Sequence, residues 1–305
     1  MVGAGLAPPA RGHLAMLLFS ALVAGSFSLG GLAAPEIDPR AFMAARFLFA
    51  ALLLALVVRA TMGPGALKFR APWRYAVLGA LYAGYFVGMF WALRYGAPVS
   101  LAAVFTLTPL LAGLAGWVLL RQAATGRMAV ALAIGAAGAL WVIFRADLDA
   151  LFAFAVGRGE VIFFFACISH ALYIPVVRMV NRGEAVLPFT CGVLTFAFLV
   201  LLPVAAAPVA ATDWAALPAI VWITLAYIVV FATMVSSYLL AFASLRLPAA
   251  KVMAYTYLTP AWVILWEFAL GHGGPPALVI GGVGLTMVAL WLLLKDEDAP
   301  PVVAS

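Results

Sequence analysis

A few side chains with titratable or hydrogen-bonding chemistry lie deep inside long apolar segments of this sequence. His170 stands about twelve residues into the apolar run 158–180, so a helix rising about 1.5 Å per residue would place its imidazole roughly 18 Å from the start of that run. Five tyrosines also lie away from the ends of such runs: Tyr82, Tyr85, Tyr173, Tyr238 and Tyr255. Their rings would form an apolar wall, and their hydroxyls would need polar partners. Such a wall suits a small solute with an apolar body and a polar head.

The tripeptide Leu-Thr-Pro interrupts one apolar run in each half of the chain. It stands at 107–109 and 258–260, so the two prolines are 260 − 109 = 151 residues apart. A proline inside a helix removes a backbone hydrogen bond, and we expect Pro109 and Pro260 to bend their helices. Thr108 and Thr259 would offer hydroxyls to a substrate at these bends. Two prolines can align by chance, but matched interruptions in the two halves of a membrane protein point to a central substrate site.

These residues do not form the constellation of an enzyme. The histidines His13, His170 and His272 are scattered too widely to hold a metal ion, and the sequence contains no phosphate-binding loop and no pair of carboxylates inside an apolar run. We therefore predict no catalytic residues, no metal and no cofactor. Because no Asp or Glu lies deep in an apolar run, His170 is the one deep group that titrates near neutral pH.

The composition indicates what surrounds these side chains. Hydrophobic residues make up 67% of the chain and charged residues 9%, whereas a soluble domain carries about 25% charged residues. Apolar runs of about 20 residues recur from end to end, and each can span a bilayer as a helix. The net charge of +6 is spread over short loops, which argues against a nucleic-acid partner. Cys167 and Cys191 lie inside apolar runs and indicate no disulfide framework.

The sequence therefore predicts an all-α integral membrane protein with ten transmembrane helices. The expected spans are 13–34, 40–59, 73–94, 98–120, 127–145, 158–180, 186–207, 214–243, 248–270 and 275–294. The first five spans form one repeat, 13–145, and the other five a second repeat, 158–294, while 1–12 and 295–305 are short tails. The lipid bilayer is then a partner of the whole chain, and no obligate protein partner is evident.

The basic residues set the expected orientation in the membrane. Most of the 17 Lys and Arg residues fall in loops that lie inside if the N-terminus is cytoplasmic, among them Arg59, Lys68, Arg70 and Arg182. Both termini are then cytoplasmic. Because each half has an odd number of spans, the second half is inverted relative to the first, as in many secondary transporters.

Three further charged residues lie nearer the ends of their apolar runs. Arg46 is about 9 Å from the outer end of 40–59, so its side chain could snorkel to the interface. Structural pairing and substrate binding both stay open for it. Glu267 and Lys251 each stand about three residues from an end of 248–270, and we interpret both as interfacial.

The order and spacing of several motifs resemble the drug/metabolite transporter superfamily, in its ten-helix form with two EamA repeats. In the first half they are Ala45-Arg46-Phe47-Leu48, Trp91-Ala92-Leu93 and Thr108-Pro109, and in the second half Ser169-His170-Ala171-Leu172-Tyr173 and Tyr257-Leu258-Thr259-Pro260. The family commonly has a glutamate twelve residues after the proline, where this chain has Arg121 and His272, so no role of that glutamate carries over. The overall pattern is most similar to bacterial exporters of aromatic and other amino acids.

This resemblance implies a secondary transporter of the bacterial inner membrane. We expect export of amino acids, aromatic ones included, by alternating access through a central cavity in which His170, the tyrosines and the threonines orient the substrate. Drugs, nucleotide sugars and other metabolites are the alternative substrates on the same fold. Anionic phosphates would call for Lys or Arg near the midplane, and no Lys or Arg is expected there. A lipid-handling enzyme or a scaffold would need a catalytic cluster or a soluble domain, and neither is evident.

Overall fold

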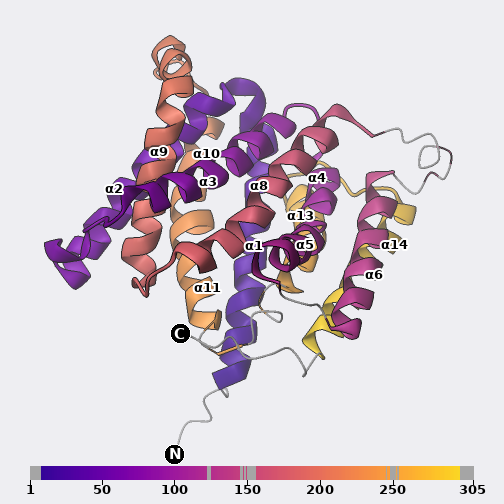
Figure 1. The fold of residues 1–305 in the computed structure, drawn as a ribbon. Helices are drawn as coiled ribbons and strands as arrows, with labels where there is room; N and C mark the ends of the chain where they lie inside the picture. Colours follow the sequence, from indigo (N-terminus) through magenta and orange to yellow (C-terminus); the bar gives the residue numbers. More distant parts are fainter. Residues whose placement is uncertain are drawn as a thin grey trace, which may run out of the picture.

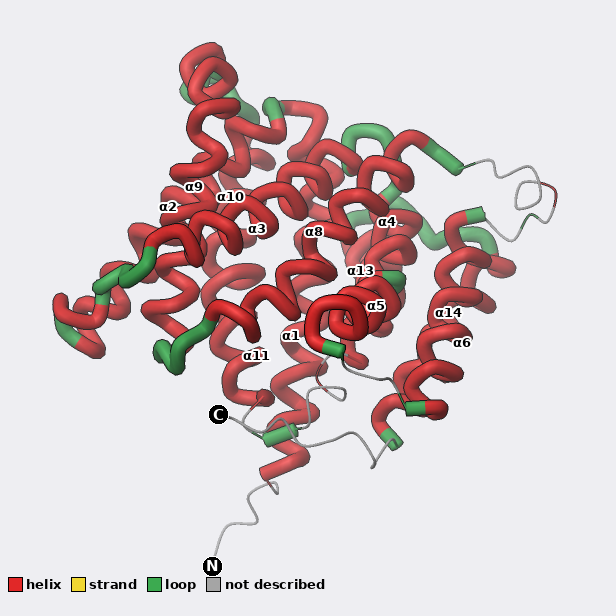
Figure 2. Tube along the Cα trace, in the orientation of Figure 1, coloured by secondary structure: helices red, strands yellow, loops and turns green. Residues whose placement is uncertain are grey.

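The computed structural model describes residues 8–121, 125–144, 156–244 and 254–295, together with positions 147, 149, 246, 247 and 252. Throughout these ranges the regular structure is helical, and Figure 2 shows helices joined by short loops. In this part of the chain 9 helices are long and apolar enough to cross a membrane. The expectation of an all-helical, multi-pass membrane protein is confirmed.

Several helices in the first half of the chain begin with proline. The described elements are α1 (Pro8–Ala33), η1 (Ala34–Glu36), α2 (Pro39–Met62), η2 (Pro64–Ala66), α3 (Pro72–Ala92), α4 (Pro98–Phe105), α5 (Thr108–Leu120) and α6 (Gly126–Ile143). Pro39, Pro72 and Pro98 start their helices, which suits proline because the first N–H groups of a helix have no partner in any case. At α2 the carboxylate of Asp38 accepts the N–H of Arg40 at 2.8 Å and caps the helix.

The second half contains one long helix that changes its winding midway. The described elements are α8 (Arg158–Val180), α9 (Val186–Ala211), α10 (Ala219–Val229), η3 (Val230–Val235), α11 (Ser236–Ser244), η4 (Tyr255–Leu258), α13 (Thr259–Ala269) and α14 (Ala277–Leu294). α10, η3 and α11 follow one another without a break, and η3 is a π-helix. Such short π segments occur often at functional sites.

Nine of the ten expected spans coincide with a long apolar helix. The exception is the expected span 248–270, because residues 248–251 and 253 lie outside the described residues. Its described part consists of η4 and α13. The tenth crossing and the inversion of the second half therefore stay predictions.

At each Leu-Thr-Pro tripeptide a short turn with three-residue hydrogen bonding interrupts the α-helical winding. α4 ends at Phe105, and the amide N–H groups of Thr106 and Leu107 bond three residues back, to Ala103 and Val104, before α5 begins at Thr108. In the second copy the 3-10 helix η4 occupies the same place before α13. Pro109 and Pro260 each stand in the first turn of the helix that follows. Both apolar runs thus contain two helical pieces joined at the tripeptide.

Helices of the two sequence halves interleave in space. α1 lies near the centre and packs against α4 of its own half and against α10, α11 and α13 of the other half (Figure 1). α3 packs against α8 and α9, α2 against α9, and α6 against α14. The largest buried core therefore collects residues from both halves, among them Phe27, Phe47 and Phe163.

Two glycines allow the backbones of neighbouring helices to approach closely. A Cβ at Gly79 of α3 would lie 2.6 Å from the backbone nitrogen of Ala197 in α9. A Cβ at Gly138 of α6 would lie 2.7 Å from the carbonyl oxygen of Gly282 in α14. In membranes, small residues allow this approach, and close packing replaces the hydrophobic effect as the force that joins helices.

An ion pair fixes the start of α3 to the end of α8. Arg74 is 1% exposed, and its guanidinium donates to a carboxylate oxygen of Glu184 at 2.6 Å and to the carbonyl of Val180 at 2.6 Å. Burial alone would raise the pKa of Glu184, but the hydrogen bonds from Arg74 and from the backbone N–H of Arg182 outweigh it and lower that pKa to about 2. The loop 181–185 is thereby held against α3.

Candidate functional site

Four of the residues singled out in the sequence meet between α3 and α8. The rings of Tyr85 and His170 stack with centroids 4.4 Å apart, and His170 lies parallel to Tyr173 at 6.4 Å. Tyr82 completes the group, because its ring centroid is 5.5 Å from that of Tyr173. Positions 82 and 85, like 170 and 173, are three residues apart and so share one face of a helix. We refer to Tyr82, Tyr85, His170 and Tyr173 as the aromatic cluster.

Phenylalanines from two other helices extend this cluster. Phe105, the last residue of α4, lies 6.0 Å from Tyr85 and 5.9 Å from His170 between ring centroids. Phe27 of α1 contacts Phe105 at 5.8 Å and Phe163 of α8 at 5.7 Å. Phe105 stands two residues before Leu107, where the Leu-Thr-Pro tripeptide begins. The break thus places the end of α4 beside the imidazole.

The imidazole of His170 has hydrogen-bonding capacity that the described residues leave unused. Its Nδ1 atom is buried and has no partner among them. A buried polar atom without a partner costs about 1–3 kcal/mol. Depending on the tautomer, this nitrogen can donate to a ligand or accept from one.

Arg46 of α2 lies at the edge of the aromatic cluster, which corrects the expectation that it could snorkel to the interface. The residue is 1% exposed, and its guanidinium carbon lies 3.7 Å from the ring centroid of Phe86. Phe86 in turn contacts Tyr82 at 4.7 Å and Tyr85 at 4.6 Å. Nη2 donates to the hydroxyl of Thr233 at 3.2 Å, and Nη1 faces the sulfur of Met43 at 3.8 Å.

The charge of Arg46 is not neutralised by the described part of the chain. No carboxylate there lies within ion-pair distance of it, and its Nε is buried without a partner. The sequence carried little signal for this position. Every residue from Ala41 to Phe47 is buried, so no one-sided apolar stripe marks the face of α2 that holds Arg46.

Thr233 belongs to the π-helix η3 and was not singled out in the sequence. Its hydroxyl donates to the carbonyl of Ile228, five residues earlier, at 2.8 Å, and accepts from Arg46. The wider turn of a π-helix frees carbonyls from their usual partners. A side chain from the second half of the chain thus contacts the buried cation of the first half.

The other expected site residues lie elsewhere. Tyr238 is 60% exposed and contacts Phe242, and Tyr255 bonds to His13 at 2.9 Å. Thr108 and Thr259 are buried at the starts of α5 and α13, and the Thr108 hydroxyl lies next to the thiol of Cys167. Among the described contacts, none joins Tyr238, Tyr255 or Thr259 to His170 or Arg46.

A set of aromatic side chains in the second half holds α1 in place. The hydroxyl of Tyr227 donates to the carbonyl of Leu22 at 2.8 Å, the indole N–H of Trp266 donates to that of Ala21 at 3.2 Å, and Trp262 donates to the Ser20 hydroxyl at 3.0 Å. Gly25 of α1 leaves room for Tyr227 and Trp266. We call Tyr227, Trp262 and Trp266 the α1 clamp.

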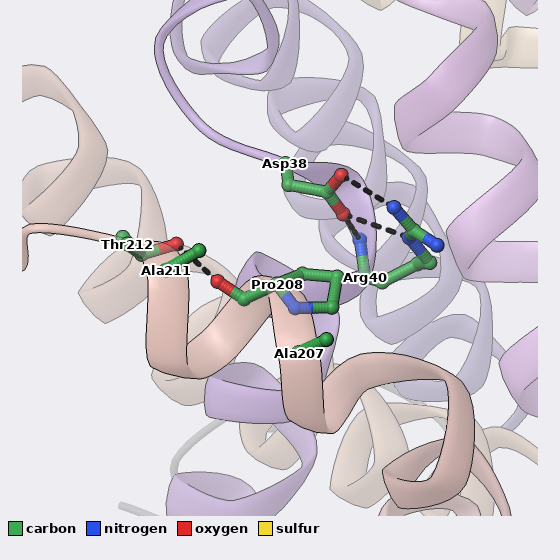
Figure 3. Close-up of a pocket in the computed structure, with 6 residues that line it drawn as sticks. All are labelled: Asp38, Arg40, Ala207, Pro208, Ala211 and Thr212. Carbon is green, nitrogen blue, oxygen red and sulfur yellow. Dashed lines mark hydrogen bonds and ion pairs between the residues drawn. The ribbon is translucent and has the colours of Figure 1, made fainter.

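A cavity of about 480 Å³ lies at the start of α2 and the end of α9, outside the aromatic cluster. It is lined by Asp38, Arg40, Ala207, Pro208, Ala211 and Thr212 (Figure 3). Its charged groups already neutralise each other, because Arg40 donates to both carboxylate oxygens of Asp38 at 3.1 and 3.0 Å. The side-chain hydrogen bond from Arg40 lowers the pKa of Asp38. The aromatic cluster and Arg46, which have buried polar atoms without described partners, are the stronger candidate site.

Comparison with known proteins gives the chain a family. A model of the EamA-like transporter family matches residues 10–144 and 157–295. The chain is 24% identical over 284 residues to the "Uncharacterized transporter YyaM" of Bacillus subtilis (strain 168), covering 92% of both proteins. It is 24% identical over 306 residues to the "Uncharacterized transporter YetK" of the same organism, covering 95% of this chain and 89% of that protein. A solved structure, described as "Crystal structure of protein", shares the fold with a TM-score of 0.64 at 20% identity, over 93% of this chain and 95% of that one.

Proposed function

Because the chain belongs to the EamA-like transporter family, we propose that it is a secondary transporter of the bacterial inner membrane that exports amino acids, aromatic ones among them. The aromatic cluster around the imidazole of His170 carries this proposal. It offers ring faces for an apolar side chain and a ring nitrogen without a partner for a polar group. The apolar and the polar part of an amphipathic solute could therefore both be bound there.

Transport in this proposal proceeds by alternating access. The solute binds between α3, α8 and the end of α4, and the helices that meet there then shift so that the site opens to the opposite side. The two Leu-Thr-Pro breaks supply the joints, because a helix without continuous backbone bonds can change its angle at low cost. The solute gradient or a coupled ion would drive the flux.

Drugs, nucleotide sugars and other metabolites are the alternative substrates. The buried Arg46 weakens the argument against anions, which rested on the lack of Lys or Arg near the midplane. One guanidinium balances a single negative charge, however, whereas a phosphate monoester carries between one and two at neutral pH. The described site therefore favours a solute with one carboxylate.

Counterflow in proteoliposomes tests the proposal. Vesicles loaded with unlabelled phenylalanine, methionine or threonine should take up the labelled compound faster than protein-free vesicles. His170→Ala should slow phenylalanine counterflow about three- to tenfold, the effect of one lost hydrogen bond together with lost ring contacts. Tyr238→Phe is the matched control, because Tyr238 is 60% exposed and lies outside the aromatic cluster.

Thermal unfolding in detergent shows whether each variant is folded. If none of the amino acids moves faster than in protein-free vesicles, the amino-acid proposal fails and the alternative substrates are tested in its place. If amino acids move but His170→Ala matches the control, the function stands and the site moves away from the aromatic cluster.

A further inference from the structure

We propose that Arg46 is the residue that binds the carboxylate of the transported solute, so that the solutes are monocarboxylates with an apolar or aromatic body. This inference rests on the proposed transport function and assigns its anion-binding group. It is carried by the contacts of the Arg46 guanidinium, by the position of that group beside the aromatic cluster, and by the balance of charge around it.

The buried charge of Arg46 has a cost in free energy. α2 begins at Pro39, so Arg46 is about 10 Å along a membrane-spanning helix. A charged side chain at such a depth is expensive unless an opposite charge or strong hydrogen bonds compensate it. Its contacts among the described residues are the Thr233 hydroxyl, the Met43 thioether and the rings of Phe86 and Phe47. None of these carries a negative charge.

The guanidinium of Arg46 has N–H donors that the described residues leave unused. Arginine has five N–H donors, and a carboxylate binds two parallel ones as a fork. Here one oxygen of the described residues, the Thr233 hydroxyl, accepts a hydrogen bond from Arg46. Nε is buried without a partner, and Nη1 faces only a weak sulfur acceptor. The donors that a carboxylate needs are therefore present and not otherwise engaged with oxygen.

Arg46 lies next to the aromatic cluster, with Phe86 between them. Phe86 covers one face of the guanidinium at 3.7 Å and contacts Tyr82 and Tyr85. Tyr85 stacks on His170 at 4.4 Å. A solute with its carboxylate on Arg46 can thus lay its apolar body along the aromatic cluster. If the solute is an amino acid, its ammonium would find ring faces and the free Nδ1 of His170.

The test compares ligands that differ in the carboxylate, using the full chain purified in detergent. Thermal stabilisation is measured with phenylalanine, with 3-phenylpropionate, which lacks the amino group, and with phenylalaninamide, which lacks the charged carboxylate. The wild type should respond to both carboxylates at concentrations at least about tenfold below those needed for the amide, since a charge-assisted pair contributes at least that factor.

Two variants make the assignment specific to Arg46. Arg46→Gln should remove the preference for carboxylate over amide, and Arg46→Lys should recover part of it, because lysine keeps the charge but loses the fork. Arg40→Gln is the matched control on the same helix, since Arg40 pairs with Asp38 away from the cluster. A role of Arg46 in stability alone would change the unfolding temperature and leave the ligand preference in place.

The inference and the proposed function fail in different ways. If the amide stabilises the wild type as well as phenylalanine does, or if Arg46→Gln keeps the full preference, the assignment of Arg46 is overturned even where counterflow of amino acids is observed. If amino acids show no counterflow but 3-phenylpropionate still binds in a manner that requires Arg46, the amino-acid function fails and the carboxylate site stands.

Discussion

At the scale of single residues, the ion pair of Arg74 and Glu184 makes stability depend on pH. The pKa of Glu184 is lowered in the folded protein from the model-compound value of 4.5 to about 2. The pair therefore stabilises the fold fully above about pH 4.5, and this contribution is lost as the pH falls toward 2. We expect Glu184→Gln to unfold at a lower temperature than the wild type at pH 7, and the difference between the two to shrink as the pH falls to about 3.

Unfolding in detergent from pH 7 to pH 3, followed by tryptophan fluorescence, measures this difference. The comparison with the variant cancels the pH dependence that the two proteins share. A constant difference between wild type and variant across the range would contradict the role given to Glu184.

The predicted and the missed site residues differ in what their position depends on. The contacts among Tyr82, Tyr85, His170 and Tyr173 agree with a prediction made from depth in the apolar runs. The same criterion also selected Tyr238 and Tyr255, which lie elsewhere, so depth alone does not predict which side chains meet. Arg46 was judged by its distance from the end of its run, which permits snorkelling. Its real direction depends on the rotation of α2 about its axis. An apolar helix gives little sign of that rotation, and because every residue from Ala41 to Phe47 is buried, no local pattern indicated the direction of Arg46.

At the scale of helices, the contact of α6 with α14 depends on the absence of side chains at Gly138 and Gly282. A Cβ at Gly138 would meet the carbonyl of Gly282 at 2.7 Å and the Cβ of Leu285 at 2.9 Å. We expect Gly138→Val to lower the free energy of unfolding by about 1–3 kcal/mol through overpacking. Gly284→Val is the control, because its Cβ would have no atom of another residue within 4 Å.

Thermal or denaturant unfolding of the two variants gives the comparison. Valine has a higher helix propensity than glycine, so Gly284→Val should unfold at or above the wild-type temperature. Equal unfolding temperatures for the two variants would show that the close approach of α6 and α14 does not limit stability.

The helix breaks could be predicted from sequence, but the π-helix could not. Leu-Thr-Pro gives a local reason for an interruption, since proline lacks an N–H wherever it stands. Residues 230–235, Val-Phe-Ala-Thr-Met-Val, contain no such signal. The features that distinguish η3 are two contacts of Thr233, one to the carbonyl of Ile228 and one to Arg46 of a distant helix. A contact between residues 187 positions apart is not visible in a local pattern.

At the scale of the whole molecule, the two sequence halves are not the two packing units. α1 belongs to the first half by sequence, but the α1 clamp of Tyr227, Trp262 and Trp266 bonds it to the second half. α2 and α3 pack against α9 of the other half, and α3 also packs against α8. Any motion that exposes the aromatic cluster therefore moves groups of helices drawn from both halves.

If the second half is inverted relative to the first, corresponding loops of the two halves should lie on opposite sides of the membrane. The loop after the second span of the first half contains Lys68, and the corresponding loop of the second half contains Ala215, with α9 before it and α10 after it. Five predicted spans separate these positions, so they should lie on opposite sides of the membrane. His272, after α13, should lie on the same side as Ala215 only if the segment 248–270 crosses the membrane.

Single cysteines test both statements. Cys167 and Cys191 are buried and are replaced by alanine, and Lys68→Cys, Ala215→Cys and His272→Cys are introduced one at a time. All three positions are exposed. A membrane-impermeant maleimide added to intact spheroplasts should label positions 215 and 272 and should reach position 68 only after lysis.

Labelling of positions 68 and 215 from the same side would overturn the inversion. Labelling of position 215 but not 272 would leave nine crossings, and the second half would then lack the counterpart of the span formed by α4 and α5.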